Sequence, residues 1–575
     1  MTPMMRSRPD VRSVTADVVV VGSGGAGLSA ACAAARAGAD VVVVTKGRAG
    51  RANATAYAGG GFTVSPPAGS AAALGEEALT PEKHFRLSLE TGRLLGDPRL
   101  LEEMCRRGPE ALRELEREYG VRFDWSSGGC SVHRFGRPPL LGGFGLTGPL
   151  VSYLRRAGVR LFEGTVVTRI MVEDGRVEGV LAVSPGSAGV DLIAFAAPAV
   201  VVATGGGGAV YGRTDNPPRM TGDGYRLLRR AGAALVDMEF VQFYPLGVAE
   251  PGLPARLLDT SLLDFVRLTD ETGAEPLAGR LEEWGLESWA RANLFARDRL
   301  AVALARHAAA GHRLFLRTDE VRGDAVPGEY LEHLRGSFLR SFDLFSRPLR
   351  VAPTQHYFCG GAVFNERGEV LDAEGRPIPG LHACGETTGG VDGANRLGGN
   401  ALTNIVVFGL AAGRAAAAYA RGRSGRASVT RAPWSSAARE EEERLSRWGV
   451  GDRGTWPGAA APAGGRGRVG RRGAGRPHRL RRELHALADR LLGPVRSGPK
   501  LKEALAGLED LGRRVPDLEV TTPSDLLLAL EMESAVATAT YVARSALERT
   551  ESRGSHFRED FPAEDPDWEK HVVLG

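Results

Sequence analysis

The strongest pattern of hydrophobic and polar positions lies near the start of the chain. Residues 18–21 are a run of valines, which predicts a buried strand. A glycine-rich segment at 22–27 (GSGGAG) follows, and residues 28–38 have the alanine-rich composition of a helix. Residues 39–45 are apolar again and predict a second strand. This order of strand, glycine-rich turn, helix and strand predicts a βαβ unit with parallel strands.

The glycine spacing gives this unit a chemical interpretation. In the pattern G-x-G-x-x-G, glycine lets the backbone approach a pyrophosphate, and the N–H groups at the start of the following helix bind it. The alternative is a plain glycine-rich turn. The second strand ends in Thr45-Lys46, where an NAD site usually carries an acid, so the pattern argues against a simple nicotinamide dehydrogenase and leaves an FAD protein open. The predicted contacts are Gly22, Gly24, Gly25, Ala26, Gly27, Thr45 and Lys46.

Several later segments combine an apolar run with a glycine-rich turn. Residues 199–204 predict another buried strand, which leads into the glycines at 205–208. Residues 389–402 form a second long glycine-rich loop, which opens a helix predicted over 403–420. Two distant loops of this kind suit a long cofactor that is held at both ends. The further predicted cofactor contacts are Thr55, Ala58, Gly59, Gly60, Val167, Ala203, Thr204, Gly205, Asp223, Glu386, Asn400, Ala401 and Leu402.

Composition limits the number of domains and the class of protein. The chain has 575 residues, enough for about three domains, and its 43% hydrophobic and 25% charged residues are typical of a globular protein. The formal net charge is +4, but residues 466–482 alone hold eight arginines and no acid. Because that segment has no interleaved aromatic residues, we interpret it as a solvated linker and expect no nucleic-acid partner.

The cysteines and the apolar runs indicate the compartment. Five scattered cysteines without a CxxC motif argue against disulfides, a zinc site or an iron–sulfur cluster, so we expect no metal site and a reducing cytoplasm. The first residues lack the apolar stretch of a signal peptide. The longest apolar run, 405–420, contains Arg414 and predicts a buried helix rather than a membrane span. Any membrane association is therefore expected to be peripheral and to occur through a partner.

Longer motifs make a resemblance specific. In chain order they are GSGGAG, TAYAGGG, NPPRMTGDG, MEFVQFYP, ARDRLAVA, HYFCGG, HACGETTGGVDGANRLGGNAL and ALERTESRGSHFREDFP. With these motifs the chain resembles the flavoprotein family of succinate dehydrogenase, fumarate reductase and L-aspartate oxidase over nearly its whole length. The resemblance implies an α/β fold, with a Rossmann-like FAD-binding domain interrupted by an α+β capping domain and followed by a helical C-terminal domain. The expected boundaries are 14–240 and 352–425 for the FAD-binding domain, 241–351 for the capping domain, 426–482 for a partly disordered linker and 483–575 for the helical domain.

The resemblance also implies how FAD is held. Membrane-bound members of the family attach FAD covalently through a histidine in the segment that corresponds to residues 51–61 here. This chain has Ala54 at that position. Because an imidazole is needed to form the bond, we expect non-covalent FAD, as in the soluble aspartate oxidases.

Three residues match the family's catalytic positions. Arg297 corresponds to the arginine that donates or accepts a proton opposite the flavin. Arg396 corresponds to an arginine that binds a substrate carboxylate, and His356 to a histidine that binds the same or the other carboxylate. A guanidinium is a planar fork suited to carboxylates. Without the resemblance, Arg297 would be interpreted as a surface arginine and His356 as a core histidine.

The far end of the substrate site departs from the family. Tyr244, in MEFVQFYP, stands where the family usually has His, and it keeps a hydrogen-bond donor but carries no positive charge. The family's Arg-Gly-Glu-Gly element is missing, and Asp259 and Thr260 stand near the place of the Thr-Glu that precedes it. Two partners of a second carboxylate are thus altered or lost. We therefore expect a monocarboxylate or a bulkier acid as substrate rather than succinate or fumarate.

Three functions remain open at this point. The first is FAD-dependent hydride transfer between flavin N5 and the α,β-carbons of a carboxylic acid, with Arg297, His356, Arg396 and Tyr244 as the site. The second is aspartate-oxidase-like amine oxidation with O2 as acceptor. The third is a flavin-bearing electron-transfer subunit that has an iron–sulfur partner and a degenerate substrate site.

Overall fold

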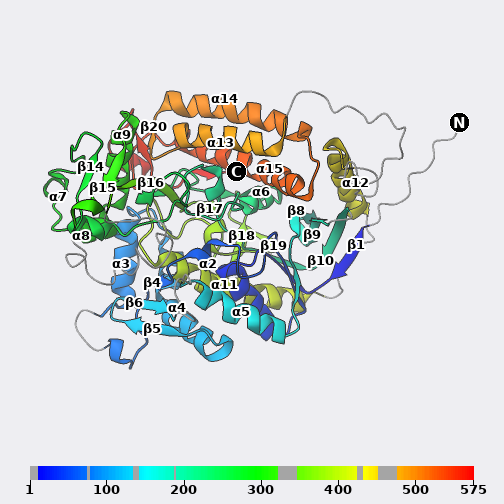
Figure 1. The fold of residues 1–575 in the computed structure, drawn as a ribbon. Coiled ribbons are helices and arrows are strands. Elements are labelled where there is room, and N and C mark those ends of the chain that lie inside the picture. The colour runs from blue at the N-terminus through cyan, green and yellow to red at the C-terminus, as the bar shows by residue number, and fades with distance from the viewer. Residues whose placement is uncertain are drawn as a thin grey trace.

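The computed structural model describes residues 11–73, 78–133, 142–186, 189–321, 346–423, 432–450 and 475–575. Within them, helices flank a central parallel sheet, a layer of strands and short helices lies at one side, and long helices cover one end (Figure 1). This mixture of parallel sheet and helices, with a helical C-terminal region, confirms the expected fold class.

The βαβ unit predicted at the start of the chain forms the centre of a six-stranded sheet. Strands β2 (Val18–Val21) and β3 (Val41–Val44) pair in parallel, and helix α1 (Gly25–Arg36) connects them. Successive valines of each strand belong to two different buried clusters, because side chains alternate between the faces of a sheet and both faces are covered. The strand order is β18-β19-β11-β2-β3-β7. The other strands are β7 (Arg160–Phe162), β11 (Ala199–Val202), β18 (Glu369–Leu371) and β19 (Pro377–Ala383).

Helices cover one face of this sheet. Helix α11 (Asn400–Gly422), predicted from its apolar run, packs along α1. A Cβ atom at Gly413 would lie 2.1 Å from the carbonyl oxygen of Ala30, so only glycine permits this close approach. Helices α3 (Pro81–Thr91), α4 (Pro98–Tyr119) and α5 (Phe144–Arg156) complete the layer.

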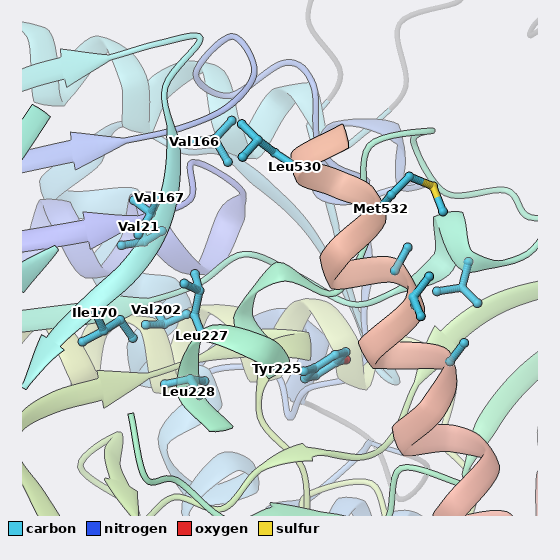
Figure 2. Packing of buried hydrophobic residues seen from close by; sticks show 14 of the residues in the cluster. Val21, Val166, Val167, Ile170, Val202, Tyr225, Leu227, Leu228, Leu530 and Met532 are labelled. Atoms are coloured by element: carbon cyan, nitrogen blue, oxygen red, sulfur yellow. The ribbon is translucent and has the colours of Figure 1, made fainter. Parts of the chain in front are cut away.

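A second sheet and the C-terminal helix cover the other face. The strand order of this sheet is β1-β10-β9-β8. Valines from β2 and β11, residues of β8, leucines of helix α6 (Asp223–Arg230) and residues of helix α15 (Pro523–Glu548) share one buried cluster (Figure 2). The strands are β1 (Arg12–Thr15), β8 (Val166–Glu173), β9 (Arg176–Pro185) and β10 (Val190–Ala196).

Two helices, α11 and α15, are long and apolar enough to cross a membrane by length and composition. The most apolar windows of the two are 78% and 72% buried inside the protein. Both helices therefore belong to the core, as predicted for residues 405–420.

A separate layer carries the segment predicted as the capping domain. Its sheet has the strand order β13-β16-β15-β14 and its own buried leucine cluster. We call these strands, together with helices α7, α8 and α9, the cap layer. The strands are β13 (Val241–Val248), β14 (Leu268–Asp270), β15 (Leu314–Leu316) and β16 (Leu349–Phe358). The helices are α7 (Arg280–Glu283), α8 (Trp289–Phe295) and α9 (Arg297–Ala309).

The C-terminal region is helical, but it begins earlier than predicted. Helix α13 (Pro477–Leu491) starts inside the range 426–482 that was expected to be a linker. Helix α14 (Gly498–Arg514) packs against both α13 and α15. Helix α12 (Ala432–Arg447) also lies in that range. The physical reason is that apolar residues of these helices, such as Trp434 and Leu480, are buried. Residues 451–474, which hold part of the arginine-rich segment, lie outside the described residues.

Short elements connect these layers. The three-stranded sheet next to α2 (Ala54–Tyr57) has the order β4-β6-β5, and another has the order β17-β12-β22. These strands are β4 (Gly61–Phe62), β5 (Phe123–Ser126), β6 (Gly129–Val132), β12 (Leu235–Val236), β17 (Gly361–Ala362) and β22 (Val573–Leu574), and β20 (Val495–Arg496) pairs with β21 (Phe557–Arg558).

Candidate active site

A long cleft opens at the carboxyl ends of β2, β3 and β11, the edge at which doubly wound sheets bind ligands. It holds about 880 Å³ of empty space, including the part open to solvent. Most of the predicted cofactor contacts line it. These are Gly22, Gly24, Gly25, Ala26, Thr45, Lys46, Thr55, Val167, Ala203, Thr204, Gly205, Asp223 and Glu386.

The glycine-rich turn forms one wall because its backbone has no room for side chains. Gly22 has a φ of +108°, and a Cβ atom there would lie 2.2 Å from the carbonyl oxygen of Ala203. Gly27 does not line the cleft. A Cβ atom at Gly27 would lie 2.2 Å from the oxygen of Gly22, so this glycine lets α1 pack closely against the turn.

Lys46 and Asp223 form the polar end of the cleft. The Nζ atom of Lys46 lies 2.7 Å from Oδ2 of Asp223 and 3.2 Å from Oε1 of Glu531, which comes from α15. Burial would raise the pKa of Asp223, but the Lys46 ammonium reverses that effect and the pKa is lowered. Asp223, at the start of α6, places a carboxylate in the cleft beside Lys46, which follows β3. Asp223 is therefore available as an ionised acceptor for ribose hydroxyls.

Some predicted cofactor contacts lie outside the cleft. Ala58, Gly59 and Gly60 pack against the backbone before α5, where a Cβ atom at Gly142 would lie 2.0 Å from the oxygen of Gly59. Asn400, Ala401 and Leu402 form the first turn of α11, and the Asn400 side chain bonds to His84 and Ser88 instead. The close approach that these small residues permit is thus between two protein segments. Their contact with FAD stays a prediction.

Other lining residues were missed by the sequence analysis. Ser23 donates a hydrogen bond of 2.9 Å to Thr45, and Asn53 caps α2 by accepting from the N–H of Ala56. Arg219 donates to Glu531 at 2.7 Å and to the carbonyl oxygen of Lys46. Arg219 lies in NPPRMTGDG, so its position in the motif that carries Asp223 was an available signal.

The residues of this cleft fit FAD. Helix α1 begins at Gly25, and its N-cap residue Gly24 has no side chain to cap it. The Gly25 N–H donates to Thr55 at 3.1 Å, and the next N–H groups of the helix suit a pyrophosphate. Ala54, at the position of the attaching histidine, lines the cleft without a group that could bond to a flavin. Glu386 also lines the cleft, where burial raises its pKa to about 7 and the Phe358 N–H, which donates to it at 3.0 Å, opposes that rise.

Two of the predicted catalytic residues contact each other directly. Nη2 of Arg396 lies 2.9 Å from Nε2 of His356. The Asp215 carboxylate is 3.1 Å from Nδ1 of His356, which places the ring hydrogen on Nδ1 and leaves Nε2 to accept from Arg396. Arg396 also donates to Gln242 at 3.1 Å and stacks on the ring of Tyr357 at 4.4 Å. Its Nε atom is buried and finds no hydrogen-bond partner in the described part of the chain, so the group has an unused donor.

Arg297 and Tyr244 form a second cluster beside the first. The Arg297 guanidinium stacks on the Tyr244 ring at 4.9 Å, and both residues donate to Oδ1 of Asn293, each at 3.2 Å. Asn293 in turn donates to Asp259 at 3.3 Å. The rings of Tyr244 and His356 meet edge to face at 5.9 Å, which joins the two clusters. All four predicted catalytic residues are therefore brought together.

The environment of Arg297 is unusual for an arginine. It is 7% exposed, and burial lowers the pKa of its guanidinium, as does the charge of Arg396, while Tyr244 raises it. A Cβ atom at Gly398, in the glycine-rich loop before α11, would lie 3.4 Å from Nη2 of Arg297. The second glycine-rich loop, which contains Arg396, therefore lies against the Arg297 guanidinium.

Comparison with known proteins agrees with this geometry. Residues 17–402 match the family described as FAD binding domain, and residues 481–575 match fumarate reductase flavoprotein C-term. One subunit of fumarate reductase (CoM/CoB) from Methanothermobacter marburgensis is 33% identical over 97% of this chain and 96% of its own. L-aspartate oxidase of Streptomyces coelicolor is 32% identical over 98% of this chain and 92% of its own. The structure of Mycobacterium smegmatis Sdh1 in complex with UQ1 has a TM-score of 0.79 at 29% identity, covering 98% of this chain and 92% of that chain.

Proposed function

This chain belongs to the flavoprotein family of fumarate reductase, succinate dehydrogenase and L-aspartate oxidase, and we propose that it oxidises or reduces the α,β-carbon bond of a carboxylic acid held between Arg396 and Arg297. Membership makes it an FAD-dependent oxidoreductase. The observation that carries the proposal is the contact series Arg396–His356–Tyr244–Arg297 beside the second glycine-rich loop.

Arg396 binds the substrate carboxylate, and His356 positions Arg396 by accepting a hydrogen bond from its Nη2 atom. The other two guanidinium nitrogens of Arg396 bond to Gln242, His356 and Leu397. The Nε–H has no partner in the described residues, so we assign this donor to the ligand. The positive charge of Arg396 also stabilises the enolate that develops on the carboxylate when the carbon next to it gains or loses a bond to hydrogen. When bound, FAD supplies the redox chemistry by exchanging a hydride with the other carbon.

Arg297 moves the proton. Its pKa is lowered by burial, and a guanidinium with a lowered pKa is a better proton donor. Asn293 holds the Nε atom at 3.2 Å, and the Tyr244 ring fixes the plane of the guanidinium. Because these contacts use Nε and the face of the guanidinium, the Nη atoms, which face the glycine-rich loop, are available to the substrate.

The substrate class follows from the charges around Tyr244. Asp259 adds a carboxylate at this end, where it accepts from Asn293. Arg267 is paired with Glu275 and Glu320, and Arg256 stacks on Tyr57 at 5.3 Å, so both have other partners. A second substrate carboxylate here would be desolvated next to Asp259, which is unfavourable. The proposed substrate is therefore an acid with one carboxylate and a neutral tail.

One observation supports a second candidate, amine oxidation. The Asp259 carboxylate at the far end suits a substrate ammonium better than a carboxylate, and the 32% identical relative is named L-aspartate oxidase. Release of hydrogen peroxide with an amino acid under air, without reduction of a C=C bond in an unsaturated acid, would favour this candidate.

Electron transfer to a partner is part of the proposal. The name of the Methanothermobacter relative makes that protein one subunit of a larger enzyme, and the solved Mycobacterium structure is a complex with UQ1. We infer a cytoplasmic flavoprotein that exchanges electrons with an iron–sulfur protein and reaches a membrane only through that partner. Purification of the tagged chain from its own cells, followed by iron analysis of the co-purified proteins, tests this inference.

The main test is reduction of unsaturated acids by a chemically reduced dye. Purified protein is given fumarate and a series of monocarboxylic 2-enoates, and the product acids are identified by mass spectrometry. Turnover of any enoate that is lost in Arg396→Met supports the proposal. Absence of turnover across the series, together with peroxide release from an amino acid, would replace it with amine oxidation.

A further inference from the structure

The geometry points to a divalent transition-metal site in the cap layer, formed by Asp270, His307 and His312. The three residues come from the end of β14, the last turns of α9 and the turn before β15. Their ligand atoms all lie within 4.8 Å of one another. The site is independent of the proposed function, because Arg297 lies at the opposite end of α9.

Asp270 is oriented as a ligand. Its Oδ1 atom accepts from the backbone N–H and the hydroxyl of Thr272 and from the N–H of Ala274, at 2.6–3.0 Å. This leaves Oδ2 for the histidines. The side chain is 2% exposed.

The two histidines converge on that oxygen. Nε2 of His307 lies 3.0 Å from Oδ2 of Asp270. Nδ1 of His312 lies 3.7 Å from the same oxygen and 3.6 Å from Oε1 of Glu271. The rings are nearly parallel, with centroids 4.6 Å apart.

The separation of these atoms is what a small ion requires. Ligands at 2.0–2.1 Å from a tetrahedral zinc lie about 3.3 Å apart, and Oδ2 of Asp270 lies 3.0 Å from one histidine nitrogen and 3.7 Å from the other, on either side of that value. The separation of 3.7 Å is too long for a hydrogen bond. Nδ1 of His312 is buried, and among the described residues it finds no hydrogen-bond partner. A metal ion would satisfy this nitrogen, with a water molecule completing its coordination.

The donor set selects the class of metal. Two imidazoles with carboxylates suit Zn²⁺ and related ions, whereas Ca²⁺ and Mg²⁺ prefer oxygen ligands alone. An ion bound by these three residues would fix the C-terminal end of α9 to the sheet of the cap layer. The sequence also carries a signal that the cysteine-based analysis passed over, because His307 and His312 have the H-x₃₋₅-H spacing of zinc sites.

The test uses the full-length flavoprotein. The protein is treated with a chelator, dialysed against Zn²⁺ or Co²⁺, passed through a desalting column, and analysed for metal and flavin content. We expect one metal ion per chain and, with Co²⁺, the intense visible bands of tetrahedral cobalt at wavelengths longer than those of the flavin. His312→Gln and His307→Gln should each lower the retained metal at least tenfold, whereas His133→Gln, which changes an exposed histidine beside Asp124, should retain it.

Flavin content and circular dichroism show whether each variant is folded. If His312→Gln is unfolded, the cobalt spectrum of the wild-type protein decides the question alone. The proposal is overturned if the wild-type protein retains less than a tenth of an equivalent of metal. It is equally overturned if a folded His312→Gln variant retains as much metal as the wild-type protein.

Discussion

Arg93 and Asp298 form an ion pair of 2.7 Å that joins the loop after α3 to the first turn of α9 in the cap layer. Asp298 directly follows Arg297, the proposed proton donor. The Asp298 side chain is 4% exposed and that of Arg93 is 19% exposed. Arg93 has a φ of +55°, a backbone conformation that is unfavourable for this residue type, and its carbonyl oxygen accepts from Arg553. The pair therefore positions the helix that carries Arg297.

Asp298→Asn should lower kcat/KM about tenfold without loss of FAD. The variant keeps the shape of the side chain but loses the charge that holds Arg93, and a tenfold loss corresponds to about 1.4 kcal/mol of transition-state stabilisation. Glu283→Gln is the matched control, because Glu283 forms an exposed pair with Arg280 in the same layer. Equal activities of the two variants would show that the Arg93 pair has no positioning role.

The protein should release all of its FAD on denaturation. Ala54 lines the cofactor cleft and offers no nucleophile or ring nitrogen for a bond to the flavin. After acid precipitation, we expect the yellow colour in the supernatant and a protein mass equal to that of the polypeptide. Flavin fluorescence that stays with the precipitated chain would contradict non-covalent binding.

The cofactor cleft could be predicted from sequence because its signals are local. The run of valines, the glycine spacing and the helix after it all lie within residues 18–38, and each specifies backbone geometry on its own. The glycines at 59 and 60 show where such reasoning ends. Their composition predicts a close approach, but only the fold determines that the approaching segment is the backbone at 142 and 143.

Arg297→Lys should lower kcat at least a hundredfold and leave FAD binding unchanged. Lysine keeps the charge, but it loses the fork that bonds to Asn293 and stacks on Tyr244. General acid catalysis typically contributes a factor of about 10² to 10⁴. Arg299→Lys, at an exposed position of the same helix, serves as the control. Near-normal turnover of Arg297→Lys with a confirmed substrate would exclude the proton-transfer role.

Asp392→Asn should stabilise the protein above about pH 6. Burial raises the pKa of Asp392 from its usual 3.8 to about 6, and one of its oxygens is buried without a partner in the described part of the chain. A raised pKa means that the folded state binds more protons than the unfolded state, so stability falls as pH rises from about 4 to about 6. Asparagine lacks this titration.

The difference in unfolding free energy between the variant and the wild-type protein should therefore be small near pH 4. It should grow to a plateau above pH 6, with about 3 kcal/mol as the upper limit. Urea unfolding at several pH values measures it. Glu374→Gln, at an exposed turn, should show no such growth. A difference that does not depend on pH would mean that Asp392 is not neutralised by burial.

The catalytic contacts were less predictable than the cleft. Motif positions indicated Arg297, His356, Arg396 and Tyr244, but Asn293, which joins Tyr244 to Arg297, carries no signal in sequence. It lies 49 residues from Tyr244, and an amide in a helix is an ordinary surface residue until the fold buries it between two donors. Gln242, which bonds to Arg396, lies within the motif MEFVQFYP, but its partner shows only in the fold. Residues that orient a catalytic group by hydrogen bonds become visible only in three dimensions.

The final prediction is that fumarate and succinate are poor substrates, and that Tyr244→His improves fumarate turnover relative to monocarboxylic enoates by about tenfold. At present a second carboxylate would meet the Tyr244 hydroxyl and, through Asn293, the Asp259 carboxylate, and neither carries positive charge. A protonated histidine would restore a cation at the position where the family usually has one. Because one charge-assisted hydrogen bond contributes about 1.5–3 kcal/mol, a change of this size is expected.

Tyr244→Phe is the control, since it removes the hydroxyl without adding charge, and it should leave the preference for monocarboxylates intact. The ratio of kcat/KM values for fumarate and a 2-enoate, measured below and above pH 6.5, checks the argument, because the gain must fall when the new histidine loses its proton. Fumarate as the best substrate of the wild-type protein would show that another cation binds the second carboxylate.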